Sequence, residues 1–351
     1  MGTRQFRREA SIQFGTSSQL LTQLIPDPEF GGLAAGSQLI TENDSGLKFQ
    51  FQFTRTNRSN PDRGTLRIYG LRRSIAEGIL ADMEANIAFR ETLLKNFFPD
   101  DSSRARALAT HADSYKVTVR AGYRNNSDIV FVGQMMNVAP TTRLGRTDVV
   151  AEIELGDSIE GFRTGYVNQV FGAGATMKNV VELVSASAGW RSSEDIAAQI
   201  NIVAPDAVLT FAGKGFHAVG RPAETLDEIM EMFGLQWFVR DGKVLFAAQG
   251  TLLSLPTVVL QEGVDLLTGI TTRKGYGDFQ GMALLNSRIQ PGVGMRILKA
   301  DGTPLSRTGY RCNAVTHSGD THGRPWYSSF QAGEIATSVF SDELVFSELT
   351  G

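Results

Sequence analysis

The stretch LKFQFQFT at positions 47–54 alternates apolar and polar residues without a break. Successive side chains of a β-strand point to opposite faces, so this pattern predicts a strand with one buried and one exposed face. The turn residues NPDRG at 60–64 follow, and Leu66 and Ile68 then begin a second strand. The chain is therefore expected to build a half-buried antiparallel sheet.

A helix is expected directly after this strand pair. Residues 74–77, SIAE, fit a capping box in which Ser74 caps the helix and Glu77 reaches back to it. Apolar residues then recur at helical spacing, namely Ile75, Ile79, Leu80, Met83 and Ile87. Further strands are expected around residues 115–121, 129–132 and 149–155. This region is thus predicted to be antiparallel β with one helix laid on it, a sandwich or a barrel.

The pattern changes after Gly156-Asp157. The stretch GAGATMK at 172–178 superficially resembles a phosphate loop, but it lacks the GxxxxGK[ST] spacing and no strong strand precedes it. We interpret it as a helix start with Thr176 as N-cap and a stop near Gly189. A short strand at 208–211, a second helix at 226–233 and a hairpin at 236–246 around Asp241-Gly242 follow. Together these elements predict a small α+β module.

The last hundred residues again indicate β structure. Short strands are expected at 258–260, 270–273, 310–317 and 326–330, with glycine-rich turns between them. The stretch MALLNSRIQPGVGMRIL at 282–298 is interpreted as a strand pair that turns at Pro291-Gly292. The fold class is therefore α+β, mainly β: two antiparallel β-barrel or sandwich domains with a small α+β module between them.

These patterns divide the chain into four parts. Residues 1–46 form an N-terminal strand, expected at 10–15, and an extended arm. Residues 47–160 form the first β domain with its helix. Residues 161–250 form the α+β connecting module, and residues 251–351 form the second β domain with a C-terminal tail.

The composition excludes several kinds of chemistry. The single cysteine, Cys312, rules out a disulfide within the chain and a thiolate metal cluster, and its strand pattern predicts a small buried residue. The 34 basic and 37 acidic residues give a net charge of −3 without a polybasic block, so no nucleic-acid footprint stands out. We find no apolar signal region and no apolar run long enough to span a bilayer, and expect a soluble protein without an export signal.

No group of residues indicates catalysis. The stretch HSGDTH at 317–322 could bind a metal or supply a base, but it has no third ligand or nucleophile partner, so we interpret it as a tight turn. The acid pairs at 227–228 and 342–343 are expected on solvated faces, and the pair at 100–101 in a polar loop. Trp190, Trp237 and Trp326 could stack on sugars, but core packing is favoured. No catalytic residue, cofactor site or metal site is assigned, and the chain is not expected to be an enzyme.

Three passages, in this order, carry a resemblance to a known family. The first runs from Leu47 through RGTLRIYGLRRSIAEGIL to VTVRAGYRNNSDIVFVGQM and DVVAEIELGDS. The second is GATMKNVVELVSASAGW with RPAETLDEIMEMFGLQWFVRDGKVLF. The third is LLTGITTRKGYGDFQGMALLNSRIQPGVGMRIL with YRCNAVTHSGDTHGRPWYSSF. The chain resembles, over about residues 47–330, the baseplate hub proteins of contractile-tailed bacteriophages, the late control D type, and their relatives in contractile injection systems. Family members often carry proline where this chain has Ser287, and residues 1–46 and 331–351 match nothing in the family.

The resemblance implies a structural virion protein of the tail baseplate, synthesised in the host cytoplasm. Such hubs form a homotrimeric ring in which each subunit contributes two tail-tube-like β domains. The ring would adapt a hexameric tail tube, or its initiator protein, to a trimeric central spike, contact baseplate wedge proteins, and leave a channel for DNA passage without specific binding. Two alternatives stay open: a tail-associated cell-wall hydrolase and a carbohydrate-binding tail protein.

Overall fold

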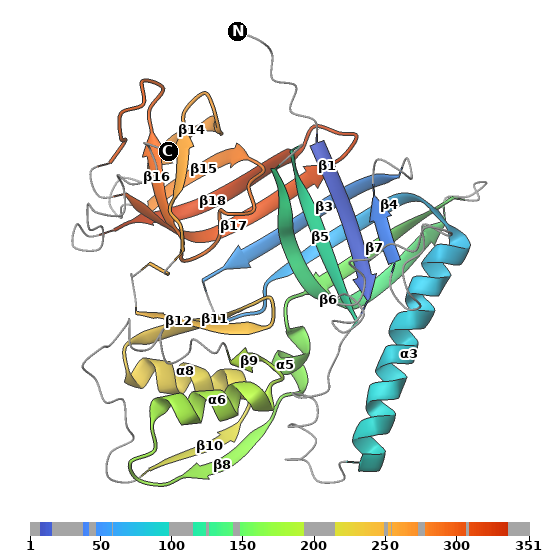
Figure 1. Ribbon diagram of the computed structural model, residues 1–351, viewed down its shortest axis with the longest axis vertical. Helices are drawn as coiled ribbons and strands as arrows, with labels where there is room; N and C mark the ends of the chain where they lie inside the picture. The colour runs from blue at the N-terminus through green and yellow to red at the C-terminus, as the bar shows by residue number, and fades with distance from the viewer. Residues whose placement is uncertain are drawn as a thin grey trace.

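One long β-sheet runs through most of the described chain (Figure 1). The computed structural model describes residues 8–15, 38–41, 47–57, 59–97, 115–123, 126–142, 148–192, 215–248, 252–253, 255–272, 278–306 and 309–335. The sheet has thirteen strands, and the main path through it is β14-β15-β18-β17-β3-β4-β7-β6-β5-β1-β2. The fold is therefore mainly β with few helices, as the sequence predicts.

The first half of the sheet contains the strand pair with which the sequence analysis began. Its strands are β1 (Arg8–Gly15), β2 (Gln38–Thr41), β3 (Lys48–Thr56), β4 (Arg63–Arg72), β5 (Lys116–Tyr123), β6 (Asn126–Thr142) and β7 (Asp148–Gly156). The expected strand at 10–15 lies within β1, which pairs with β5 and β2. The remainder of the predicted arm, 16–37 and 42–46, lies outside the described residues.

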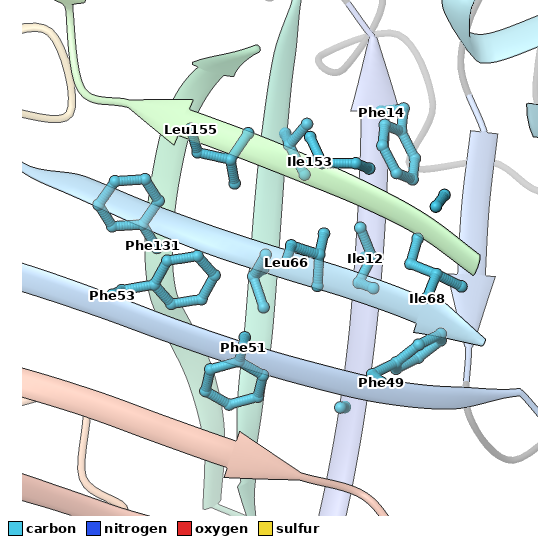
Figure 2. Packing of buried hydrophobic residues seen from close by; sticks show 14 of the residues in the cluster. Ile12, Phe14, Phe49, Phe51, Phe53, Leu66, Ile68, Phe131, Ile153 and Leu155 are labelled. Carbon is cyan, nitrogen blue, oxygen red and sulfur yellow. The ribbon is translucent and has the colours of Figure 1, made fainter. Parts of the chain in front are cut away.

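Aromatic and aliphatic side chains fill the core of this half. Phe49, Phe51 and Phe53 of β3 are buried, as the alternation predicts. Phe53 stacks on Phe131 of β6 with 4.6 Å between ring centroids. Figure 2 shows β1 crossing behind β4, so that Ile12 belongs to the same packed cluster as Leu66 and Ile68. The sheet thus curls over its own apolar face.

The helix α3 (Arg73–Phe97) follows β4 without an intervening loop. Ala76 and Ile79 are buried, and Leu80 and Met83 pack partly buried against the same core. The predicted capping box is wrong, because the helix begins at Arg73 and Glu77 forms an ion pair with the Arg73 side chain at 2.8 Å. Ile75 was also wrongly assigned to the apolar face, since it is 36% exposed. The side chain of Ile87 lies outside the described residues.

The second half of the sheet contains the strands β13 (Val258–Gln261), β14 (Leu266–Thr272), β15 (Asp278–Leu284), β16 (Gly294–Leu298), β17 (Tyr310–Asp320) and β18 (Trp326–Glu334). Met295 and Ile297 are buried as their alternation predicts. The predicted strand pair within 282–298 is wrong, however. β15 pairs with β14 and β18, whereas β16 pairs with β13 and β17. The turn at Pro291-Gly292 lies in the segment between β15 and β16, which connects two strands that are not adjacent in the sheet.

The two halves repeat one pattern. A first ladder of adjacent antiparallel strands runs β6-β7-β4-β3, and a second ladder runs β17-β18-β15-β14. Along the chain, β3, β4, β6 and β7 appear in the same order as β14, β15, β17 and β18. β5 pairs beside β6 just as β16 pairs beside β17. The equivalent strands are therefore β3 and β14, β4 and β15, β6 and β17, and β7 and β18.

The two ladders join edge to edge at one seam. β3, the last strand of the first ladder, pairs antiparallel with β17, the first strand of the second, from Ala314↔Thr56 to Asp320↔Gln50. The side-chain hydroxyls of Thr54 and Thr316 lie 3.1 Å apart across this seam. The seam joins residues more than 250 positions apart in the sequence, so local pattern alone could not predict it.

Cross-strand glycines make room for the core phenylalanines in both halves. Gly319 of β17 is paired with Phe51 of β3, and a Cβ added at Gly319 would overlap the Phe51 ring. We expect Gly319→Ala to lower the free energy of unfolding by about 1–3 kcal/mol, since overpacking forces rings off their rotamers. Denaturant unfolding measures this loss. Gly172→Ala is the control, because a Cβ there meets nothing within 4 Å and should change stability by less than about 0.5 kcal/mol; equal effects at both positions would contradict the packing argument.

The α+β module lies beside the sheet (Figure 1). It contains the helices α5 (Ile159–Thr164), α6 (Met177–Ser187) and α8 (Pro222–Met232) and the strands β8 (Val167–Phe171), β9 (Arg191–Ser192), β10 (Phe216–Gly220), β11 (Leu235–Arg240) and β12 (Lys243–Ala248). The predicted helices and the 236–246 hairpin are confirmed. The predicted strand at 208–211 lies outside the described residues. α6 and α8 pack between the β8–β10 pair and the β11-β12-β9 sheet.

Candidate functional site

A broad polar face covers the side of the sheet that turns away from the core. Alternate residues of β3 that are not in the core are Gln50, Gln52 and Thr54. The seam carries this face onto the second ladder, because Gln52 is paired with Ser318 and Thr54 with Thr316. The same face continues through Tyr327, Ser329 and Gln331 of β18 and through Gln280 and Met282 of β15. One continuous surface rich in hydroxyl and amide groups therefore spans both ladders.

The charges on this face are balanced in sign. Among the described side chains of β3, β4, β7 and residues 314–320 of β17, the charged ones on this face are Lys48, Arg63, Arg67, Glu152, Glu154 and Asp320. Arg67 donates to Glu152 at 2.7 Å, and Lys48 lies 3.0 Å from Asp320. Burial alone would raise the pKa of Asp320, but hydrogen bonds from Gln50 and Lys48 hold it below its usual value. The face therefore offers a polyanion neither strong attraction nor strong repulsion.

A buried ionic cluster lies at the junction of the sheet with the α+β module. Its centre is Asp157, at the end of β7, which is 3% exposed. The Asp157 carboxylate accepts hydrogen bonds from the backbone N–H groups of Asp241 (2.5 Å) and Gly242 (3.2 Å) and from the Ser158 hydroxyl (2.9 Å). Asp241 and Gly242 have positive φ angles, 51° and 78°, as their turn requires. Asp157 therefore holds the tip of the β11–β12 hairpin against the first ladder.

The same hairpin also reaches the second half of the sheet. Arg240, 7% exposed, donates to the Gln290 side-chain oxygen at 2.8 Å and to the Pro291 carbonyl oxygen at 2.6 Å. Burial lowers the pKa of Arg240 to about 10, so the side chain stays protonated at neutral pH. One hairpin of the module is thereby hydrogen-bonded to both halves of the sheet.

Arg55 of β3 supplies a buried positive charge to this cluster. Its side chain is 2% exposed, donates to Asp241 at 3.1 Å and lies over the Phe131 ring. Nearby, the Asp62 carboxylate accepts from the Thr56 N–H at 2.9 Å. Burial raises the pKa of Asp62 to about 7, against the opposing effect of Arg55. Burial also raises the pKa of Asp157, and the Asp241 charge adds to that rise.

The predicted turn at 317–322 is partly wrong. His317 to Asp320 belong to β17, and the turn comprises Thr321–Arg324. His317 is fully buried, and its Nδ1 lies 2.9 Å from the Ser328 hydroxyl. Burial lowers the pKa of His317 to about 3, which leaves its ring neutral. His322 is exposed at the turn, so the two imidazoles do not share an environment, and the described residues contain no group of three or more metal-ligating side chains.

The other residues singled out from the sequence take mostly the expected places. Trp190, Trp237 and Trp326 are 2–3% exposed, which confirms core packing and removes them as a sugar-stacking surface. Cys312 is buried in β17, and burial raises the pKa of its thiol to about 12. Asp227 and Glu228 are exposed on α8 as expected. The acid pairs at 100–101 and 342–343 lie outside the described residues.

The glycine-rich stretch at 172–178 is a helix start, as predicted. The Thr176 side chain accepts from the Asn179 N–H, and α6 begins at Met177. The sequence indicated no strong strand before it, and the strand that precedes it, β8, ends at Phe171 and pairs with β10. β8 is short, and three of its five residues are exposed, so its apolar signal is weak.

The ionic cluster was not predicted from the sequence. One signal was present. Arg55 continues the alternation of Phe49, Phe51 and Phe53, so its side chain lies on the same, core-facing side of the strand. Asp157 and Asp241 carry no comparable local signal. They meet only because β7 ends beside the β11–β12 turn in the folded chain.

Comparison with solved structures gives two proteins with this fold. One is the Escherichia coli c3393 protein, a component of the type VI secretion system described as similar to the T4 bacteriophage tail proteins gp27 and gp5. Its TM-score is 0.51 at 11% sequence identity, and the match covers 82% of this chain and 74% of that chain. The other is a tail protein from Neisseria meningitidis MC58, with a TM-score of 0.51 at 9% identity, covering 93% and 96%. The chain shares their fold. No protein-family model matches the sequence, and a search of curated proteins finds no significant match. Among the described helices, none is both long and apolar enough to cross a membrane.

Proposed function

We propose that this chain is the baseplate hub of a contractile phage tail. It would form a homotrimeric ring that joins the hexameric tail tube, or its initiator protein, to the trimeric central spike and contacts baseplate wedge proteins. Residues 47–160 and 251–351 would be two tube-like domains, and 161–250 the connecting module. The protein would act in the virion after synthesis in the host cytoplasm, as a structural component rather than an enzyme.

The observation that carries this proposal is the pair of repeated ladders joined in one sheet. A chain with two equivalent ladders supplies six of them in a trimer, which matches a sixfold partner on one side and a threefold partner on the other. The shared fold with a tail protein from Neisseria meningitidis and with a secretion-system component described as similar to bacteriophage tail proteins supports it.

The polar face suits the lining of a channel for DNA. Phosphate binding needs uncompensated Lys and Arg. On this face Arg67 and Lys48 are paired with carboxylates, and the third cation, Arg63, is offset in number by Glu154. DNA would therefore slide along hydroxyl and amide groups without specific binding. The buried junction would keep the module at a fixed position beside this lining.

Light scattering coupled to size exclusion tests the proposal, on the chain alone and co-expressed with a spike protein encoded beside it. The expected mass is three times the 38.2 kDa subunit for the chain alone, or that mass plus the mass of the bound spike when the ring forms only with the spike. A monomer under both conditions would overturn the ring. Cleared peptidoglycan in a zymogram, or binding on a glycan array, would then favour the hydrolase or the carbohydrate-binding protein.

A further inference from the structure

The two ladders form one path of eight strands, β6-β7-β4-β3-β17-β18-β15-β14. At each end of this path, one strand edge lacks the partner that its equivalent strand has at the seam. Within the chain, β3 of the first ladder is joined to β17 of the second. Their equivalents are β14, which ends the second ladder, and β6, which begins the first. The seam therefore has a second pair of partners, β14 and β6, that the single chain does not bring together.

The C-terminal half of β6 matches the part of β17 that forms the seam. Residues 310–311 of β17 pair with β16 and residues 314–320 with β3, on the side away from β18. In β6, residues 126–134 pair with β5, on the side away from β7. Residues 135–142 pair with β7 on one side, and no described strand lies on the other. Pro140 lies in this segment and has no backbone N–H, so a strand that pairs here receives no hydrogen bond from that residue.

The edge of β14 is open in the part of the chain that the structure describes, apart from an isolated bridge between Glu262 and Leu266. Exposed apolar side chains gather beside it: Val264 is 57% exposed and Leu267 48%, with Leu255 (43%) and Val259 (52%) also nearby in sequence. An exposed edge strand beside apolar side chains is an aggregation hazard unless another chain covers it.

The strand directions also agree. All pairs along β6-β7-β4-β3-β17-β18-β15-β14 are antiparallel, so β6 and β14 run in opposite directions. A second copy placed so that its β6 lies beside β14 makes another antiparallel pair, as at the β3–β17 seam. The same contact can repeat from copy to copy, because it uses different edges of the two partners.

We propose that β14 of one copy pairs with residues 135–142 of β6 in a second copy, as a repeat of the β3–β17 seam. This contact continues the sheet and its polar face from subunit to subunit, and Val264 and Leu267 are covered by the neighbour. The proposal rests on the ring of the proposed function and specifies which edges close it.

Cross-linking between introduced cysteines tests this contact. By the register of the ladders, Thr141 of β6 is the equivalent of Ser318 and Thr271 of β14 is the equivalent of Gln52, and Ser318 and Gln52 are paired at the seam. The native Cys312 is buried with a raised thiol pKa, so it does not compete. With a short bis-maleimide, Thr141→Cys and Thr271→Cys in one chain should give covalent dimers and trimers, whereas each single variant should stay uncross-linked. A single variant that links to itself would mean a symmetric contact and would overturn the proposal.

A charge at the edge gives a second measurement on the full chain. Leu267→Lys should reduce the mass in light scattering from the oligomer to a single subunit, with an unchanged circular dichroism spectrum that shows the subunit is still folded. Val170→Lys is the control, because Val170 is 68% exposed on β8, away from both edges, and should leave the oligomer intact. If the wild type is a trimer but Leu267→Lys stays trimeric and the double-cysteine variant gives no covalent dimers or trimers, the β14–β6 contact is wrong and the hub survives. A wild type that is monomeric with and without spike overturns both.

Discussion

Arg55→Met is expected to lower the free energy of unfolding by about 3–5 kcal/mol at pH 8, as removal of one partner from a buried ionic cluster does. The substitution takes away the positive charge nearest to Asp62 and the donor to Asp241, while methionine keeps most of the apolar stem over Phe131. Urea unfolding at fixed temperature measures the loss.

The same loss should be clearly smaller at pH 5. Asp62, with its pKa raised to about 7, is then protonated, so fewer buried carboxylates are left without a counter-charge. Arg67→Met is the matched control: it breaks an exposed pair with Glu152 and should cost less than about 1 kcal/mol at either pH. An equal loss from Arg55→Met at pH 5 and pH 8 would show that packing, rather than charge, explains the effect.

The stability of the wild type is expected to fall as pH rises from about 4 to about 7. Asp62 holds its proton to a higher pH in the folded chain than in the unfolded chain, so folding takes up protons in this window and raising the pH favours unfolding. Asp157, with a raised pKa of the same cause, acts with the same sign. His317, whose pKa is lowered to about 3, acts with the opposite sign and offsets part of the fall below about pH 6.5. A shift of this size corresponds to a few kcal/mol, on the order of 1.4 kcal/mol per pKa unit.

Asp62→Asn should reduce this slope and stabilise the protein at pH 8, because the amide cannot ionise and its oxygen can still accept from Thr56. Asp320→Asn separates the opposite effect: the pKa of Asp320 is lowered, so its contribution is present above about pH 4 and is lost below it. Denaturant midpoints from about pH 2 to pH 8 measure both. If Asp62→Asn kept the full slope of the wild type, Asp62 would not be the group that titrates.

The junction explains why a mainly β protein of this kind tolerates buried charges. Asp157, Arg55 and Arg240 each contact a different part of the chain, and all three contacts converge on the β11–β12 hairpin. Directional hydrogen bonds allow fewer relative positions of packed units than apolar contacts do. The cluster therefore fixes the position of the module beside the sheet.

Local pattern determined the elements of this protein. The alternation at 47–54 predicted β3 and its buried face, Thr176 predicted the start of α6, and Asp241-Gly242 predicted the β11–β12 hairpin. These succeeded because side-chain periodicity, capping and turn conformation depend on residues a few positions apart. The predictions at 74–77 and at 317–322 failed for a common reason, because each depended on where a neighbouring strand ends.

The tertiary structure alone decided how those elements are joined. Nothing near residue 284 indicates that β15 pairs with β18 instead of β16, and nothing near Thr54 indicates that β3 meets β17. The meeting of Arg55, Asp157 and Asp241 is likewise a product of folding. Strand partners far apart in sequence are selected by the shape of the whole core and by which edges remain open, and a single strand's own residues do not encode that choice.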